Sequence, residues 1–150
     1  MIRVLVQSQD FDVGVEFAAL ESLGGGGVAS FTGIVRGGDG LAELMLEHHP
    51  GMTCSAMEQI AGEAMARWPL IGISLIHRYG SLVPGDRIVF VGTASAHRAA
   101  ALDGCAFLID WLKTSAPFWK RERFADGRSR WVEARREDDA AAERWLTARE

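Results

Sequence analysis

The sequence contains only two lysines, Lys113 and Lys120, although it holds 16 strongly basic residues in all. Every other strong base is an arginine, whose charge persists across the useful pH range. A lysine amine can lose its charge when it is desolvated and can then act as an acid, a base or a nucleophile. Because the two lysines lie seven residues apart beside Trp111, Phe118 and Trp119, they indicate a site that needs amines. The alternative is a pair of ordinary surface lysines.

Cysteine is equally scarce, and long apolar stretches are missing. Cys54 and Cys105 are too few and too far apart for a disulfide framework or a zinc site. No stretch approaches about 18 consecutive apolar residues, which excludes a membrane-spanning helix. The first residues show no apolar run behind a basic start, so we expect no signal peptide and a cytoplasmic location. Cys105 is expected in the core. Cys54, near a helix start, could have a lowered pKa, but the sequence offers it no evident base partner.

Composition limits the class of protein further. With 150 residues, of which 48% are hydrophobic, we expect one folded domain over residues 1–150. The net charge of −4 disfavours nucleic acid as a partner, since nucleic-acid binders need a cationic surface. The segment 113–136 is nevertheless rich in basic residues, and such a local patch suits a small anionic ligand or an acidic partner.

The pattern of apolar residues and turn residues predicts an α+β fold with a mainly antiparallel sheet and packed helices. Strands are expected over 2–7, 28–36, 41–48, 70–79 and 87–94, and helices over 12–22, 52–68, 96–115 and 136–149. The glycine-rich segment 37–40 predicts a hairpin between the second and third strands. Asp12 and Ser95 are the expected N-caps, and Pro117 should end the third helix before a short extended segment.

The segment from Ser95 to Glu122 is the densest in candidate site residues. His97 and Arg98 open the third helix, where free backbone N–H groups favour an anion. Lys113 lies about 24 Å away at the other end of that helix, so one copy of the chain cannot easily use both ends. A symmetric dimer could bring them together. The alternative is that His97 and Arg98 are a solvated first turn and that Lys113 offsets the helix dipole.

Lys113 and Lys120 flank a reversal at Pro117, so their amines could converge on one pocket. Two nearby ammonium groups make each other harder to charge, which makes a proton shuttle or an amine nucleophile possible near neutral pH. Arg36, at the end of the second strand, could add a phosphate clamp.

Other candidate groups carry less weight. His48 and His49 are neighbours on a strand, so their rings point to opposite faces and cannot chelate one metal. His77 lies in an apolar strand and is expected to be a hydrogen-bonded core residue. No Ser/His/Asp arrangement is present, and we expect neither a metal nor a bound cofactor.

Seven segments together resemble the large, catalytic subunit of molybdopterin synthase, the MoaE family. They are FTGIVRG (31–37), LEHHPGM (46–52), RWPL (67–70), IHRYGSLVPGD (76–86), IVFVGTASAHR (88–98), DWLKTSAPFWKRE (110–122) and RWVEAR (130–135). The similarity runs in order over nearly the whole chain and is most specific from Ala96 to Glu122.

The resemblance implies a sulfur transferase of molybdenum cofactor biosynthesis, with a hammerhead-like α/β fold. Members of the family convert cyclic pyranopterin monophosphate to molybdopterin by installing a dithiolene. The sulfur arrives as a thiocarboxylate on the carboxyl-terminal Gly-Gly of a small ubiquitin-like partner subunit. The implied assembly is a central homodimer with one small subunit at each end, a heterotetramer.

The resemblance also assigns residues. Lys113 and Lys120 stand at the positions of the two essential lysines, with Lys113 at the incoming thiocarboxylate. The implied substrate-binding residues are both lysines together with Ile34, Val35, Arg36, His97, Arg98, Arg121 and Glu122, and Phe31 would pack near them. Three departures stand out: Ile34 replaces a common lysine, His49 replaces a tyrosine, and the loop 37–41 is short.

Two other functions remain open at this point. A catalytically idle paralogue could bind the carrier or the pterin as a scaffold, although the retained lysine pair argues against it. A lyase could use Lys113 to form a Schiff base, which borohydride trapping with a carbonyl substrate would reveal.

Overall fold

The computed structural model describes residues 1–49, 51–132 and 136–147, and it has the expected α+β fold. The strands are β1 (Ile2–Gln7), β2 (Gly27–Ile34), β3 (Leu41–His48), β4 (Leu70–Arg78), β5 (Gly80–Leu82), β6 (Arg87–Ser95), β7 (Phe118–Phe124) and β8 (Ser129–Trp131). The helices are α1 (Val13–Glu21), α2 (Met52–Arg67), α3 (Arg98–Thr114) and α4 (Arg136–Thr147). The end of the expected tail helix, 148–149, lies outside the described residues. None of these helices is long and apolar enough to cross a membrane.

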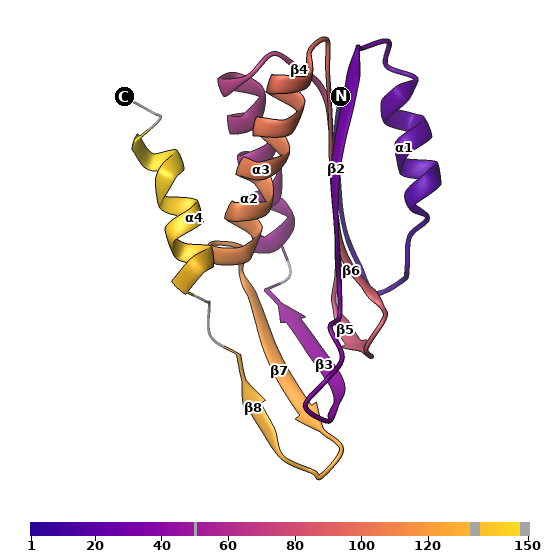
Figure 1. Ribbon diagram of the computed structural model, residues 1–150, viewed down its shortest axis with the longest axis vertical. Coiled ribbons are helices and arrows are strands. Elements are labelled where there is room, and N and C mark those ends of the chain that lie inside the picture. Colours follow the sequence, from indigo (N-terminus) through magenta and orange to yellow (C-terminus); the bar gives the residue numbers. More distant parts are fainter. Residues whose placement is uncertain (50, 133–135, 148–150) are drawn as a thin grey trace.

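The first sheet has the strand order β1-β4-β6-β2 and forms the centre of the molecule. Its β1–β4 pair is parallel, while β4–β6 and β6–β2 are antiparallel. Helix α1 covers one face and α2 and α3 cover the other, with α4 packed outside α3 (Figure 1). Apolar side chains on both faces of β4 and β6 make the core, among them Ile73, Leu75, Ile76, Phe90 and Val91.

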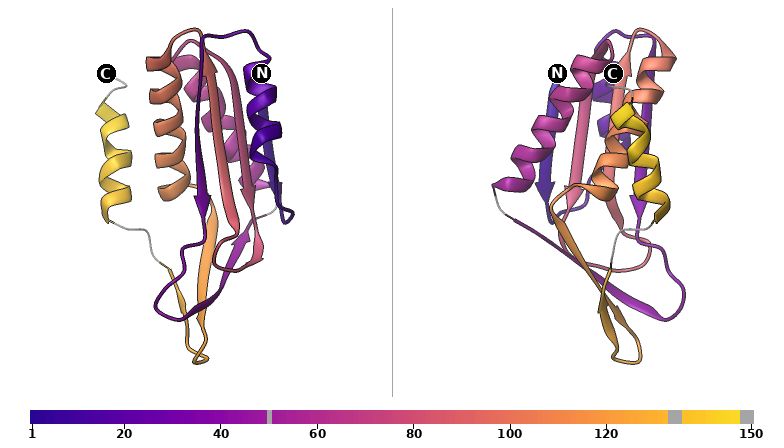
Figure 2. Two further views of the ribbon diagram at one scale, coloured as in Figure 1. Left: turned by 45° about the vertical axis from the view of Figure 1, so that its right-hand side comes forward. Right: turned by 90° about the vertical axis from the view of Figure 1, so that its left-hand side faces the viewer.

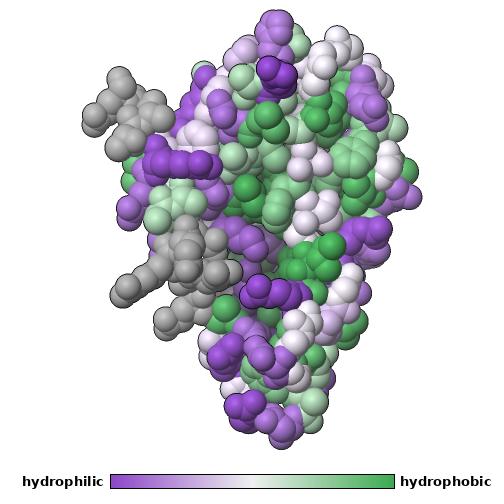
Figure 3. All heavy atoms as spheres, in the orientation of Figure 1, coloured by the Kyte–Doolittle hydropathy of each residue, from purple (hydrophilic) through white to green (hydrophobic). Residues whose placement is uncertain are grey.

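The second sheet, ordered β5-β3-β7-β8, is antiparallel throughout. It extends beyond the lower ends of the helices, and the β7–β8 hairpin forms its tip (Figure 2). Hydrophilic residues dominate the surface of that tip (Figure 3). The part of this sheet next to the helices therefore forms a junction between the two halves of the molecule.

The prediction of a hairpin between the second and third strands is wrong. β2 pairs with β6 in the first sheet, and β3 pairs with β5 and β7 in the second. The connecting segment takes positive φ values at Gly38, Asp39 and Gly40, and Leu41 N–H donates to the Gly38 carbonyl at 3.0 Å. The segment 37–40 therefore connects the first sheet to the second. β2 and β3 do not pair with each other, because β2 pairs along its length with β6 and β3 with β7.

One expected helix cap is confirmed and the other is wrong. The Asp12 carboxylate caps α1 by accepting from Val15 N–H at 3.1 Å. Ser95 is instead the last residue of β6, and its hydroxyl donates to the Pro69 carbonyl at 2.9 Å. His97 takes the N-cap position of α3 without a side-chain cap bond. The Ser95 hydroxyl therefore ties the start of β4 to the end of β6.

The glycine run before β2 lies directly against the segment that leads into α3. Gly26 N–H donates to the Ser95 carbonyl at 2.9 Å, and a Cβ on Gly26 would lie 2.2 Å from the Ala96 carbonyl oxygen. Only glycine allows this approach, which fixes the start of α3.

We predict that Gly26→Ala lowers the free energy of unfolding by about 2 kcal/mol, because the new methyl group forces two backbone segments apart. Gly62→Ala is the control, since nothing lies within 4 Å of its Cβ position in the middle of α2. It should raise stability by about 1 kcal/mol through helix propensity. Urea denaturation followed by circular dichroism measures both, and equal effects would contradict this account of Gly26.

Candidate active site

Both lysines line one cavity of about 430 Å³ at the junction of the two sheets. The segment that follows β2 and residues of the β7–β8 hairpin also line the cavity. Of the residues assigned from sequence, it is lined by Ile34, Val35, Arg36, Lys113, Lys120 and Glu122. The reversal at Pro117 therefore brings the two amine-bearing residues to the same space, as their spacing predicts.

The local geometry of the reversal explains this convergence. α3 ends at Thr114, where Ser115 N–H donates to the Trp111 carbonyl at 2.8 Å. β7 begins only four residues later at Phe118. Lys113 thus lies in the last turn of the helix and Lys120 is the third residue of the strand.

Strand alternation decides which side chains of β7 face the cavity. In the β3–β7 register Lys120 lies opposite Leu46 and Glu122 opposite Leu44, and both leucines are buried. Lys120 and Glu122 therefore share the inner face of the second sheet. Arg121 points to the other face, where its guanidinium lies 6.0 Å from the Trp131 ring.

A buried histidine supports the reversal from the first sheet. His77 is 5% exposed, and its ring stacks on Phe118 with centroids 3.7 Å apart and an angle of 17°. Its Nδ1 lies 2.8 Å from the Arg78 carbonyl oxygen, which can only accept, so Nδ1 carries the proton. Burial is the largest cause that lowers the pKa of His77 to about 3, and the charges of Lys120 and Lys113 contribute in the same direction. His77 is thus the expected hydrogen-bonded core residue, held neutral beneath the two lysines.

We predict that His77 makes stability depend on pH. The unfolded chain binds a proton on His77 near pH 6.5, whereas the folded chain leaves it neutral down to about pH 3. Within that window the unfolded state binds more protons, so stability falls as pH falls, by about 1.4 kcal/mol per pH unit. His77→Phe keeps an aromatic ring but cannot titrate, so its stability should fall less steeply. Urea midpoints between pH 6.5 and 4.5 test this, and parallel slopes for the two proteins would contradict it.

The charge of the cavity favours an anion. Its lining includes four cationic residues, Arg36, Lys113, Lys120 and Arg130, against the two acids Asp39 and Glu122. Glu122 is partly offset because its carboxylate lies 3.5 Å from the Arg130 guanidinium. A ligand that carries phosphate or carboxylate groups therefore suits this cavity best.

Arg130 also lines the cavity, although the sequence did not indicate it as a site residue. It lies opposite Glu122 in the β7–β8 register, and its long side chain reaches the cavity from the hairpin. The turn at Asp126–Gly127 with alternation on either side could have indicated this pairing. The short length of β8 obscured the signal.

Four residues that the family resemblance places in or near the site lie away from this cavity in the described chain. His97 and Arg98 are exposed at the far end of α3, and Arg121 faces the outside of the second sheet. Phe31 is also exposed, on β2, and does not line the cavity. The distance between the ends of α3 agrees with the expectation that one copy cannot use both.

Neither cysteine has the properties of a nucleophile. The position of Cys54 near a helix start does not lower its pKa, because partial burial and the nearby Glu58 carboxylate raise the pKa of this thiol. Burial raises the pKa of Cys105 to about 11, in agreement with its expected place in the core. Within residues 1–49, 51–132 and 136–147, no cluster of three His, Cys, Asp or Glu side chains could hold a metal ion.

Comparison with known proteins identifies the family. A family model described as MoaE protein matches residues 6–115. The chain is 52% identical over 149 residues to a molybdopterin synthase catalytic subunit of Pseudomonas aeruginosa, covering 96% of this chain and 99% of that protein. The chain belongs to the MoaE family. A second MoaE-family relative, the molybdopterin synthase catalytic subunit of Escherichia coli K12, is 51% identical over 147 residues, covering 95% and 97%.

The fold agrees with this membership. The molybdopterin biosynthesis MoaE protein of Burkholderia ambifaria superposes with a TM-score of 0.82 at 48% identity, covering 97% of this chain and 98% of that one. The MoaE family model ends at residue 115, just after Lys113, whereas the full-length similarities extend over β7 and β8 as well. The similarity to MoaE proteins thus covers the whole cavity.

Proposed function

We propose that this chain is the catalytic subunit of a molybdopterin synthase. In this reaction cyclic pyranopterin monophosphate becomes molybdopterin through transfer of sulfur from a thiocarboxylated small subunit. The observation that carries the proposal is the convergence of Lys113 and Lys120, with Arg36, on one cationic cavity. The relatives that cover nearly the whole chain bear the name of this catalytic subunit.

The chemistry of the cavity suits an acyl-transfer step in which the nucleophilic sulfur belongs to the partner. The thiocarboxylate sulfur attacks a side-chain carbon of the pterin and forms a C–S bond. A C–O bond of that carbon breaks at the same time, and its oxygen leaves with the electron pair and takes up a proton, so that a thioester links the partner to the pterin. Attack by water then releases the partner as a carboxylate and leaves the sulfur on the pterin. Lys113 and Lys120 would stabilise the oxyanion that develops at the acyl carbon, and Arg36 would hold the phosphate. No cysteine of this chain is needed.

The partners follow from the same proposal. A subunit named catalytic in its relatives implies a second subunit that supplies the sulfur, here a small ubiquitin-like carrier ending in a Gly-Gly thiocarboxylate. We place the assembly in the cytoplasm as a heterotetramer built on a homodimer. The exposed His97 and Arg98 would complete the pterin site of the second copy.

We predict that Lys113→Ala lowers the yield of dithiolene product more than about a hundredfold, since it removes an ammonium group from the reacting centre. Lys113→Arg should fail as well, because the site requires an amine that can approach the acyl carbon and give up a proton. The measurement is product formed from thiocarboxylated carrier and cyclic pyranopterin monophosphate in a single turnover.

Carrier binding and dimerisation serve as controls for these variants, and both should stay near the wild-type values. A fully active Lys113→Ala protein would contradict the proposed mechanism. If wild type binds the carrier and the pterin but makes no product, the chain is a scaffold and not the synthase.

A second prediction concerns the shared site. Mixing Lys113→Ala chains with Arg98→Ala chains produces dimers in which one site carries both substitutions and the other carries neither. With random exchange about a quarter of wild-type activity should return, because half of the dimers have one intact site. Mass spectrometry would confirm that chains exchange. Exchange without recovery of activity would show that each site uses residues of one copy only.

A further inference from the structure

Among the described residues, the Arg36 side chain has no partner that could fix its position. With the rest of the described chain it forms no hydrogen bond and no ion pair, and its side chain is exposed at the cavity. The ladder between β2 and β6 is already irregular at Gly33 and Ile34, before Arg36 is reached. The direction of the guanidinium therefore depends on what holds the backbone beside it.

That backbone is held by the turn between β5 and β6. Val35 N–H donates to the Asp86 carbonyl and Gly85 N–H donates to the Val35 carbonyl, both at 2.9 Å. Val35 is 3% exposed, so these two bonds are shielded from water. The turn thus clamps the residue next to Arg36 from both its N–H and its carbonyl.

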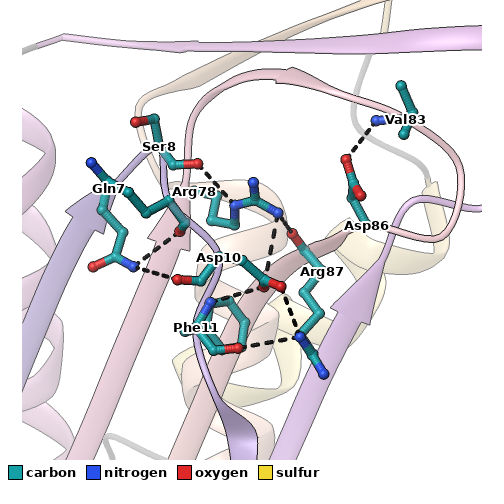
Figure 4. Close-up of polar contacts among 9 residues, drawn as sticks. Gln7, Ser8, Asp10, Phe11, Arg78, Val83, Asp86 and Arg87 are labelled. Carbon is teal, nitrogen blue, oxygen red and sulfur yellow. Dashed lines mark hydrogen bonds and ion pairs between the residues drawn. The ribbon is translucent and has the colours of Figure 1, made fainter.

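The carboxylate of Asp86 closes this turn. Its Oδ2 accepts from Val83 N–H at 2.9 Å, and Asp86 N–H donates back to the Val83 carbonyl at 3.0 Å. Figure 4 shows the carboxylate pointing back across the turn to Val83. Gly85 has a φ of +96°, a conformation that glycine adopts readily in a tight turn. Without the carboxylate the Val83 N–H would lose its acceptor and the turn could open.

Two arginines anchor the outgoing end of the same turn. Arg87 donates to the Asp10 carboxylate at 2.9 Å and to the Phe11 carbonyl at 3.3 Å. Arg78 donates to the Arg87 carbonyl at 2.9 Å and to the Ser8 carbonyl at 3.1 Å. Figure 4 shows both guanidinium groups bridging the segment after β1 to the start of β6. If Asp86 moves, the backbone of Val35 should therefore move with it, while the start of β6 stays in place.

We propose that Asp86 is a positioning residue for the substrate anion, acting through the turn 83–86 and Val35 to aim Arg36 into the cavity. This inference rests on the proposed function, because Arg36 is assigned there to the phosphate of the pterin. Asp86 touches neither the pterin nor the carrier in this account.

Asp86→Ala tests the proposal against Asp86→Asn, whose amide oxygen can still accept from Val83 N–H. Asp86→Ala should raise the KM for the pterin about tenfold while kcat changes little, since binding of the anion is what Arg36 supplies. Asp86→Asn should stay within about twofold of wild type. Asp12→Ala is the matched control: it also removes a carboxylate that accepts from a backbone N–H, but at the start of α1. Its KM should not change.

A double-substitution cycle shows whether Asp86 works through Arg36. In an Arg36→Ala background, Asp86→Ala should leave pterin affinity unchanged, because the group that it positions is already gone. Affinity is measured directly by equilibrium dialysis without the carrier, so the test does not need turnover. An equal loss in both backgrounds, or an unchanged KM in Asp86→Ala, would overturn the positioning role while leaving the synthase intact. If wild type neither binds the pterin nor forms product, both proposals fail together.

Discussion

The reversal between α3 and β7 is the constraint on which the site depends. It joins a helix that packs on the first sheet to a strand that belongs to the second, so its geometry sets how the two halves meet. The face-to-face stack of His77 on Phe118 fixes this reversal from below. A neutral imidazole suits that position, because a charged ring would be buried against two lysines at high free-energy cost.

The consequence is a cavity whose cations come from structurally independent elements. Lys113 is carried by a helix end, Lys120 by a strand and Arg36 by a segment that the turn 83–86 holds in place. Such groups cannot relax together to relieve their mutual repulsion, so an anion is the natural means of offsetting it. The remaining anion-binding candidates, His97 and Arg98, lie exposed at the opposite end of α3.

The local parts of the structure could be predicted from sequence, and the non-local parts could not. Periodicity and end signals identified α1, α2, α3 and the strands of the first sheet within a few residues, because these signals act over one turn or one strand. The sequence did not reveal that the chain passes from the first sheet to the second after β2. That passage depends on the pairing of β2 with β6, more than fifty residues away, and a glycine-rich segment carries no signal of such pairing. For the site, spacing around Pro117 was enough to bring Lys113 and Lys120 together. Arg121 was assigned to the same pocket by family resemblance, whereas strand alternation puts it on the opposite face from Lys120 within one chain.

The two lysines should form one anion site, and the scarcity of lysine makes this directly measurable. A protein labelled only at lysine side chains has two side-chain signals, one for Lys113 and one for Lys120. Nuclear magnetic resonance should show both signals shifting along the same saturation curve as cyclic pyranopterin monophosphate is added. If the pterin binds and only one signal moves, or neither does, then the lysines do not share a substrate site and the account is wrong.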